Sequence, residues 1–190
     1  MTHWQEALEI WAPAWAAIRD LKDAASEQIL AWPVEGGAFS GAVLHLVTED
    51  PVAAREFAAG LALAETGTAV LLSALTDDLD LVPKLPPDTN LAEVPLENYD
   101  AVEVALFDRP VAGGRVKVGD ELAVLGGLHV DVPDPDMVVA LEAVMIASLG
   151  EEAFTHGADR LFLVADAAQA ARLAPLGWSQ AAQILSFTRQ

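Results

Sequence analysis

The chain has 190 residues, of which 29 are acidic and 10 are Lys or Arg, and its formal net charge is -19. Such a negative chain repels nucleic acid and anionic membranes, so we expect neither as a partner. Cysteine is absent, which excludes disulfides, thiolate catalysis and Cys-ligated metals. Hydrophobic residues make up 53% of the chain and can form a sizeable core.

Targeting signals are not evident. The first residues, MTHWQEALEIW, contain no basic segment followed by an apolar run, so they predict no signal peptide. The longest apolar helical stretch, Met137 to Leu149, is interrupted by Glu142 and is too short to span a bilayer. We therefore expect an acidic cytoplasmic protein.

Residues 1–31 are predicted to be helical, because large apolar residues recur there at helical spacing. Pro13 is expected to kink or restart this helix. The apolar stripe predicts buried core or a homodimer interface rather than an aromatic ligand pocket. It consists of Trp4, Leu8, Trp11, Trp15 and Ile18.

A compact βαβ-like unit is predicted next. Val43 to Val47 has the pattern of a strand. Pro51 to Glu65 has the pattern of a helix, with Asp50 as its N-cap and Gly67 at its end. Thr68 to Leu75 follows as a second strand.

The stretch from Thr76 to about Pro95 is rich in Pro and Asp and is predicted to be an internal linker. It divides the chain into an N-terminal helical and βαβ extension, residues 1–95, and a second domain, residues 96–190.

The second domain begins with a pattern typical of antiparallel strands. A turn at Asp108–Pro110 and a two-residue hairpin at Gly119-Asp120 separate the strands, and Gly119 is expected to need a positive φ. Gly126-Gly127 predicts a bulge. The expected strands are 101–107, 111–118 and 121–132.

A long helix is predicted after these strands, opened by Asp134-Pro135-Asp136 and closed by Gly157. A buried strand at 161–165, a short helix at 167–174 and a closing strand at 183–188 complete the pattern. The fold class is therefore α/β (α+β), with a mixed sheet and a central helix that follows a β-hairpin.

Three stretches, taken in order, resemble the GNAT superfamily of acyl-CoA-dependent N-acyltransferases over roughly residues 98–190. They are "FDRPVAGGRVKVGDELAVLGGLHV" at 107–130, "HGADRLFLVAD" at 156–166 and "AARLAPLGW" at 170–178. The resemblance implies an acetyltransferase-like fold with acetyl-CoA or another acyl-CoA as cofactor and a small-molecule amine as substrate.

In that fold the cofactor lies in a V-shaped opening between the strands at 121–132 and 161–165. The resemblance implies that Leu128, His129 and Val130 pair with its pantetheine arm. It also implies that the stretch from Val132 to Ala140 holds the pyrophosphate at a helix N-terminus, where free amides and the helix dipole attract anions.

The chain departs from the family pattern at the phosphate loop. Residues 132–140 contain no Arg, Gln or Gly, and Ala140 alone keeps the small character of the last motif position. Asp134 can cap the helix and occupy its amides, Pro135 removes a donor, and Asp136 adds negative charge. These residues predict weak or absent binding of the pyrophosphate.

The catalytic residues of the family are not evident either. Ala174 stands where the family usually has a tyrosine acid, and the one tyrosine of the chain is Tyr99. His129 or Asp131 can serve as the general base, although the pattern favours His129 as a strand histidine with ordinary neighbours. The remaining histidines, at positions 3, 45 and 156, show no metal-ligand spacing, and we expect no metal.

Residues 43–60 resemble residues 160–177, since both have the pattern of a strand, an acidic turn and an Ala-Arg helix. The first half is therefore either a degenerate GNAT-like half or a coincidence in an Ala-rich chain. For function, three hypotheses stay open: a divergent N-acyltransferase, a non-catalytic GNAT-fold binding protein, and a dimerisation module that uses the first helices.

Overall fold

The computed structural model describes residues 3–21, 26–34, 39 and 41–189. Two compact units interleave along the chain. The unit that we call terminal comprises 1–12, 21–73 and 164–190, and the unit that we call the hairpin unit comprises 13–20 and 74–163. The units are defined by packing, whereas the predicted division at residues 95 and 96 concerns sequence organisation and stays a prediction.

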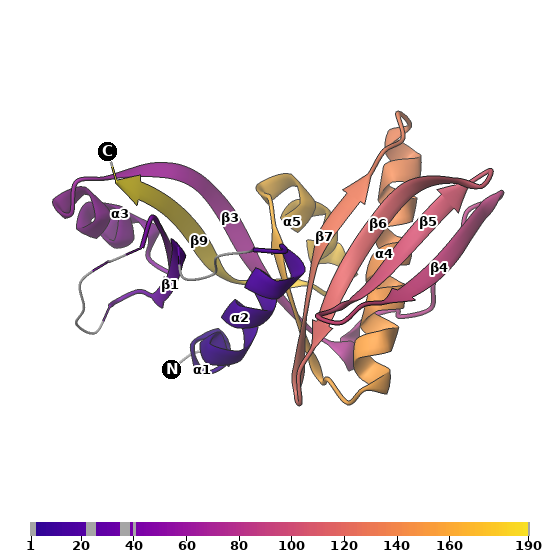
Figure 1. The fold of residues 1–190 in the computed structure, drawn as a ribbon, viewed down its shortest axis with the longest axis horizontal. Coiled ribbons are helices and arrows are strands. Elements are labelled where there is room, and N and C mark those ends of the chain that lie inside the picture. The colour runs from indigo at the N-terminus through magenta and orange to yellow at the C-terminus, as the bar shows by residue number, and fades with distance from the viewer. Residues whose placement is uncertain (1–2, 22–25, 35–38, 40, 190) are drawn as a thin grey trace. The chain divides into compact units, whose positions relative to one another are not determined.

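The α/β class is confirmed, with parallel and antiparallel strand pairs (Figure 1). The helices are α1 (His3–Glu6), α2 (Leu8–Ile18), α3 (Pro51–Gly60), α4 (Pro135–Thr155) and α5 (Ala167–Leu173), with 3-10 turns at Thr76–Asp78 and Ala174–Leu176. The strands are β1 (Glu27–Ala31), β2 (Val43–Thr48), β3 (Leu63–Leu75), β4 (Thr89–Pro95), β5 (Asp100–Leu106), β6 (Arg109–Val118), β7 (Leu122–Val130), β8 (Arg160–Ala165) and β9 (Ser179–Arg189). Within the described part of the chain, every helix is too short or too polar to cross a membrane.

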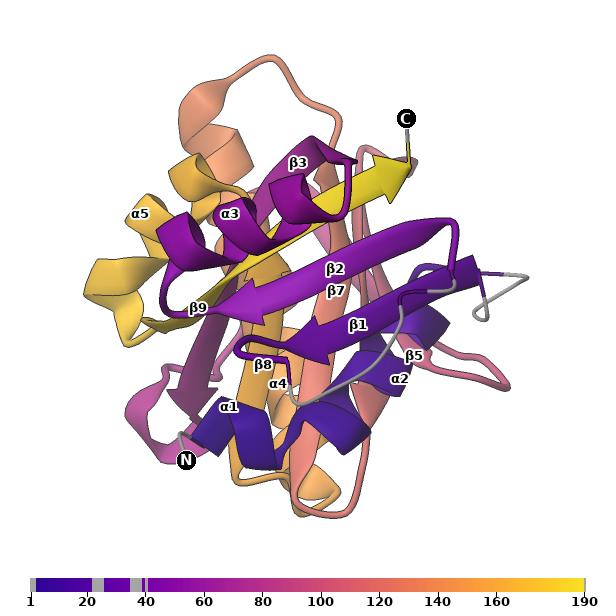
Figure 2. The same ribbon diagram turned by 90° about the vertical axis from the view of Figure 1, so that its left-hand side faces the viewer.

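In the terminal unit β1 and β2 are parallel, and β9 lies between β2 and β3, antiparallel to both. Figure 2 shows α3 next to these strands, and it contacts β2 and β9. Asp50 caps α3 by accepting the Ala53 amide at 3.1 Å, and Pro51 opens the helix, as predicted. The core of this unit consists of Leu44, Leu46, Ala54, Ala58, Leu63, Leu185 and Phe187.

Buried His45 connects three strands of the terminal unit. Its Nδ1 is 2.8 Å from the Ser186 hydroxyl on β9, and its Nε2 is 3.2 Å from a carboxylate oxygen of Glu27 on β1. A polar ring in a core is stable only when both nitrogens have partners, and these two side chains supply them. His45 is therefore a polar bridge across β1, β2 and β9.

In the hairpin unit β4, β5, β6 and β7 form an antiparallel meander, and β8 pairs with β7 in parallel. The helix α4 packs on one face of β5, β6 and β7. Buried α4 side chains such as Leu141, Met145 and Leu149 form this contact. The face of the meander opposite α4 holds the candidate site described below.

A bulge on β7 brings the end of α2 against the sheet. The β6–β7 register shifts between Gly113 and Arg115, and Gly127 has φ +60, so the predicted bulge is confirmed. A Cβ at Gly126 would lie only 2.5 Å from Cδ1 of Ile18, which is 1% exposed. Gly126 thus permits α2 to pack directly on the β7 backbone.

Substitution of Gly126 by Ala is expected to destabilise the protein by about 1 to 3 kcal/mol, because buried Ile18 or the strand must move. The matched control is Gly67→Ala on β3, where a Cβ would meet no atom within 4 Å. Its effect should stay below about 1 kcal/mol. Urea unfolding of the two variants measures the difference, and equal stabilities would show that the Ile18 contact is not tight.

The prediction of helix across residues 1–31 is confirmed for His3–Glu6 and Leu8–Ile18 and is wrong for Glu27–Ala31, and the helix does not restart at Pro13. Glu27–Ala31 is strand β1, because pairing with β2 outweighs the weak local helix preference. Pro13 lies inside α2, and the break falls earlier, at Ala7 between α1 and α2. The stretch 22–25 lies outside the described residues.

The tryptophan stripe is core, as the spacing predicts. The exposed fractions of Trp4, Trp11 and Trp15 are 2%, 0% and 9%. The indole nitrogen of Trp4 donates to Glu49 at 2.9 Å, and that of Trp11 donates to the Trp4 carbonyl at 3.1 Å. A dimer interface on these first helices stays a prediction.

Two further segments also differ from the predictions. The helix α3 ends at Gly60 rather than Glu65, because Ala62 takes φ 54 and the chain then pairs with β9 from Leu63. The second part of the predicted linker is strand β4, paired along its length with β5. Strand pairing with a neighbour, rather than the Pro and Asp content, therefore determines the secondary structure of both segments.

The two tight turns of the meander differ in detail as well. The β5–β6 turn lies at Phe107 and Asp108, which have φ 49 and 60, instead of at Asp108–Pro110. Positive φ at both central positions matches the twist of a hairpin. The β6–β7 hairpin is confirmed, but Gly119 is not among the glycines with positive φ. Its loop spans residues 119–121, and the Gly119 amide donates to the Leu122 carbonyl at 2.8 Å.

Candidate functional site

A cavity of about 640 Å³ lies over the meander face opposite α4. Ionisable side chains from distant parts of the sequence meet in it. Its charged or titratable lining residues are Arg19, Glu103, Arg115, His129 and Asp131. They lie within the hairpin unit, although Arg19 and Asp131 are more than a hundred positions apart.

Glycine forms the floor of the cavity at its centre. Gly113 on β6 pairs with Glu103 on β5 and with His129 on β7, so the three residues form one row across the sheet. Residues directly opposite in antiparallel strands share a face, and Glu103 and His129 therefore flank Gly113. A Cβ at Gly113 would lie 2.6 Å from Cε1 of His129, so the imidazole rests over the bare backbone.

The hydrogen bond of His129 fixes which of its nitrogens is basic. Its Nδ1 is 3.2 Å from the Gly127 carbonyl oxygen. A carbonyl oxygen can only accept, so Nδ1 carries the proton in this bond. In the neutral ring Nε2 then keeps its lone pair, which makes it a candidate general base.

Arg115 is held beside the cavity by a buried tyrosine and an aspartate. Its Nη1 donates to the Ile18 carbonyl at 2.7 Å and to Asp20 at 2.6 Å. The Tyr99 hydroxyl donates to the same carboxylate, at 2.9 and 3.0 Å from its two oxygens. The guanidinium carbon lies 4.8 Å from the centroid of the Tyr99 ring. These contacts order Arg115, and the hydrogen bonds described for it use Nη1 alone, which leaves its other donors for a ligand.

Burial raises the pKa of the Tyr99 hydroxyl above its ordinary value, and the hydrogen bond to Asp20 raises it further. The folded chain therefore favours the protonated form of Tyr99.

Arg19 adds a second guanidinium to the same end of the cavity. Its Nε donates to the Trp15 carbonyl at 3.2 Å, and its guanidinium carbon lies 3.6 Å from the centroid of the Trp15 ring. Stacking on the indole holds the cation in a fixed direction. The cavity therefore has cations at the Arg19 and Arg115 end and acids at Glu103 and Asp131.

The strand β7 separates from β8 beside this cavity. Their described pairing covers Leu122 to Leu125 and stops opposite Leu163. Beyond that point the second half of β7, which includes His129, keeps its pairing with β6. In this half of β7, the backbone groups that face β8 therefore have no described pairing with β8.

The start of α4 follows directly after β7. The Asp134 carboxylate accepts the Asp136 amide at 3.0 Å, and Pro135 occupies the first helical position. Both aspartates are exposed. Among the first backbone N–H donors of this helix, the one of Asp136 is therefore bound by a side chain, and the one at Pro135 does not exist.

A meander, a long helix and a parallel strand that separates from its neighbour define one known architecture. The chain has a GNAT fold. The expected resemblance is confirmed at this level by solved structures that share the fold at low sequence identity.

Three of these structures are informative. A GCN5-related N-acetyltransferase from Kribbella flavida is 17% identical with TM-score 0.61, over 77% of this chain and 67% of that one. A tandem GNAT protein from the clavulanic acid biosynthesis pathway is 13% identical with TM-score 0.59, over 78% of this chain and 64% of that one. A GCN5-related N-acetyltransferase-like protein from Streptococcus suis is 12% identical with TM-score 0.54, over 77% of this chain and 71% of that one.

No family model matches the sequence, and no curated protein matches it significantly. Because these identities lie below the level at which activity is shared, the comparisons define the fold and leave the activity to the site itself.

The structure divides the predicted site residues between two faces of β7. His129 and Asp131 line the cavity. Leu128 points the other way, toward Leu149 of α4 beside Gly114, and strand alternation places Val130 with it. Val132 precedes α4, and Ala140 lies inside its second turn. Their roles toward an acyl-CoA stay predictions.

Sequence reasoning missed three charged residues of the cavity, Arg19, Glu103 and Arg115. The strand register brings them together, and no local motif marks them. Within the described residues, no group of three or more His, Asp or Glu side chains is arranged to hold a metal ion.

The raised pKa of Tyr99 predicts a stability loss in alkali. A group whose pKa is higher in the folded chain stabilises it fully below the unfolded pKa, about 10 for tyrosine, and this stabilisation is lost as pH rises through the folded value. The free energy of unfolding should therefore fall above about pH 10, and fall less in Tyr99→Phe. Urea unfolding at several pH values measures both slopes, and identical slopes would contradict the Asp20 contact.

Proposed function

We propose that the protein binds a small zwitterion, an amine that also carries a carboxylate, in the cavity on the meander face. The separation of charge along that cavity is the observation that supports this. Arg19 and Arg115 can pair with the carboxylate, and Glu103 and Asp131 can pair with the ammonium group. A zwitterion offers both of the charges that this lining can pair with, whereas a ligand with one charge offers only one of them.

We choose the length of the probe from the strand spacing between Arg115 and Glu103. Arg115 pairs with Ala101, two residues before Glu103 on β5. Two residues of strand span about 7 Å. A straight-chain amino acid with its amine on the fifth carbon covers about this distance in extended form. We take 5-aminopentanoate as the probe.

The protein should bind 5-aminopentanoate more tightly than pentylamine or pentanoate, each of which lacks one charge. Glu103→Gln should weaken 5-aminopentanoate binding about tenfold and leave pentanoate unaffected, because it removes the ammonium partner alone. Titrations followed by NMR measure the affinities. Equal binding of the three compounds would overturn the proposal.

Coenzyme A has no role in this proposed function. Each carboxylate at about 5 Å from a pyrophosphate costs on the order of 1 to 3 kcal/mol at a protein surface. Loss of charge-assisted hydrogen bonds costs about 1.5 to 3 kcal/mol for each bond. Micromolar binding corresponds to about 8 kcal/mol, so Asp134, Pro135 and Asp136 together remove much of it.

A second candidate function is N-acyl transfer to the amine of the bound zwitterion. The separation of β7 from β8, beside the lone pair of His129 Nε2, favours it. In this reaction Nε2 would take the proton of the attacking ammonium group. Ala174, which has no ionisable proton, would leave the departing thiolate without the usual tyrosine acid.

An acetyl-CoA titration separates the two candidates. By calorimetry we expect no binding of acetyl-CoA to the native chain at millimolar concentration. The double variant Asp134→Gly, Asp136→Arg should gain binding, because it frees the amides and replaces an anion with a cation. The double variant Asp77→Gly, Asp78→Arg, which makes the same change of net charge at an exposed 3-10 turn, is the matched control.

Micromolar binding by the native chain, with transfer of the acetyl group to 5-aminopentanoate, would favour the acyltransferase instead. Failure of the double variant to bind acetyl-CoA would show that the start of α4 is not the phosphate site.

A further inference from the structure

Three polar side chains of the terminal unit, Glu27, His45 and Ser186, contact one another across the neighbouring strands β1, β2 and β9 (Figure 2). The contacts at 2.8 and 3.2 Å described above stabilise the core. They also bring together a hydroxyl, an imidazole and a carboxylate in the order that an activated serine requires. None of the three residues lines the cavity of the proposed function.

The Glu27 carboxylate fixes the direction of both hydrogen bonds. A carboxylate can only accept, so Nε2 of the neutral His45 ring carries the proton in its contact with Glu27. Nδ1 then keeps its lone pair, and its contact with Ser186 requires the hydroxyl to donate. His45 is therefore oriented as a base toward the hydroxyl proton of Ser186, and Glu27 holds it in the matching tautomer.

Burial strengthens the interaction between the imidazole and the carboxylate. His45 is 6% exposed, and the side chain of Glu27 is 17% exposed. Electrostatic interactions are stronger where little water surrounds them. If His45 takes a proton from the hydroxyl, the adjacent Glu27 carboxylate therefore stabilises the imidazolium that forms.

Ser186 is only half-buried, and its neighbour on β3 leaves it accessible. It pairs with Gly67, and residues directly opposite in antiparallel strands share a face. Gly67 is exposed, and a Cβ there would meet no atom within 4 Å, so the space beside Ser186 is open. The neighbouring paired residues on this face of β3, Ala64 and Ala69, have small side chains. A small acyl group can therefore approach the Ser186 hydroxyl from β3.

The strands on both sides fix the direction of the Ser186 side chain. Its neighbours on β9, Leu185 and Phe187, belong to the core that includes α3, so strand alternation turns Ser186 to the other face. The register of β3 on β9 shifts at Thr66, whose hydroxyl donates to the Ser186 carbonyl at 3.2 Å. Bulges of this kind are frequent next to active sites, where they redirect a side chain.

We propose that Ser186 is a reactive serine that accepts an acyl group from a small carboxylic ester, with His45 as its general base. The Ser186 oxygen attacks the carbonyl carbon of the ester, and its proton passes to Nδ1 of His45. The bond between that carbon and the alcohol oxygen then breaks, and the alcohol leaves with the proton from Nδ1. Water attacks the acyl-serine by the same route, which releases the acid and restores Ser186.

Glu27 is a positioning residue in this reaction, because it acts through His45. All three residues belong to the terminal unit, whereas the zwitterion cavity belongs to the hairpin unit. The reaction therefore does not depend on the proposed function, and its test uses a different ligand.

Two small reagents test the proposal with the full chain. Methanesulfonyl fluoride, which forms a stable bond to activated serines, should label Ser186, as located by mass spectrometry after digestion. The chain should also release p-nitrophenol from p-nitrophenyl acetate, and Ser186→Ala should abolish this release. Glu27→Gln should slow the release about 100-fold, because the tautomer of His45 is no longer fixed. Glu27→Asp, which keeps the carboxylate, should retain most of the rate.

Ser179→Ala is the matched control, since it removes an exposed hydroxyl at the start of the same strand. It should leave the labelling and the release rate unchanged. Equal rates for Glu27→Gln and Glu27→Asp would reduce Glu27 to a structural role and contradict the assignment. Labelling of the native chain that omits Ser186, or that is equal at Ser179 and Ser186, would overturn the proposal even if a variant failed to fold.

Discussion

The Asp134 carboxylate accepts a hydrogen bond from the backbone amide of Asp136, and the proposed function depends on this contact. The start of a long helix is an anion site only while its amides are free. Here a side chain occupies one amide, Pro135 supplies none, and two carboxylates surround the position. The chain thus has a fold found in solved proteins named as acetyltransferases, while the first donors of its α4 are partly satisfied and partly absent.

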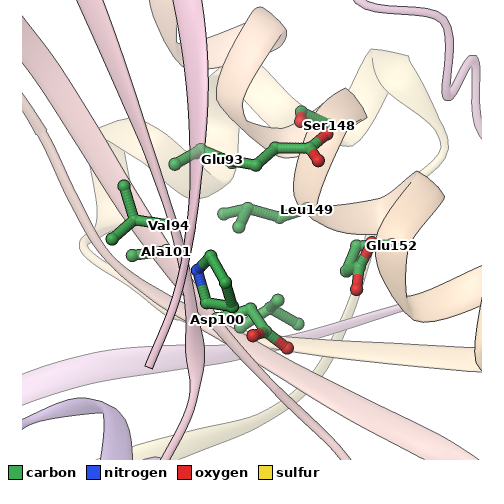
Figure 3. Close-up of a pocket in the computed structure, with 10 residues that line it drawn as sticks. Glu93, Val94, Asp100, Ala101, Ser148, Leu149 and Glu152 are labelled. Atoms are coloured by element: carbon green, nitrogen blue, oxygen red, sulfur yellow. The ribbon is translucent and has the colours of Figure 1, made fainter. Parts of the chain in front are cut away.

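Strand register brings together the charged side chains of the meander. Glu103, Gly113 and His129 stand in one row because β5, β6 and β7 pair without a shift there, and the bulge at Gly127 then sets Arg115 over the strand. On the opposite face, alternation directs Glu93 and Asp100 toward α4. One sheet therefore presents a mixed-charge cavity on one face and a cavity with an acidic lining on the other (Figure 3).

Local signals predicted the parts of the fold that depend on local chemistry. Asp50 and Asp134 cap helices with proline at the next position, and Gly127 and Gly157 take the positive φ that their positions suggest. The similarity between 43–60 and 160–177 corresponds to two strand–helix–strand segments, β2-α3-β3 and β8-α5-β9, each with an Asp-capped helix. A common origin for the two segments stays a prediction.

Elements that depend on distant partners were predicted poorly. Glu27–Ala31 becomes a strand through β2, and Thr89–Pro95 becomes one through β5, although neither has a strong strand pattern. The cavity was missed for the same reason. Arg19 and Arg115 lie far apart in sequence, and the packing of Ile18 on Gly126 brings them together with the hydrogen bonds from Arg115 to Ile18 and Asp20.

The occupied start of α4 can be tested directly at its amides. In a titration of the native chain with coenzyme A, followed by NMR, the account predicts that the amide signals of Asp136, Met137 and Val138 stay in place. Saturable shifts of those three signals, with the phosphorus resonances of the diphosphate shifting in parallel, would contradict it.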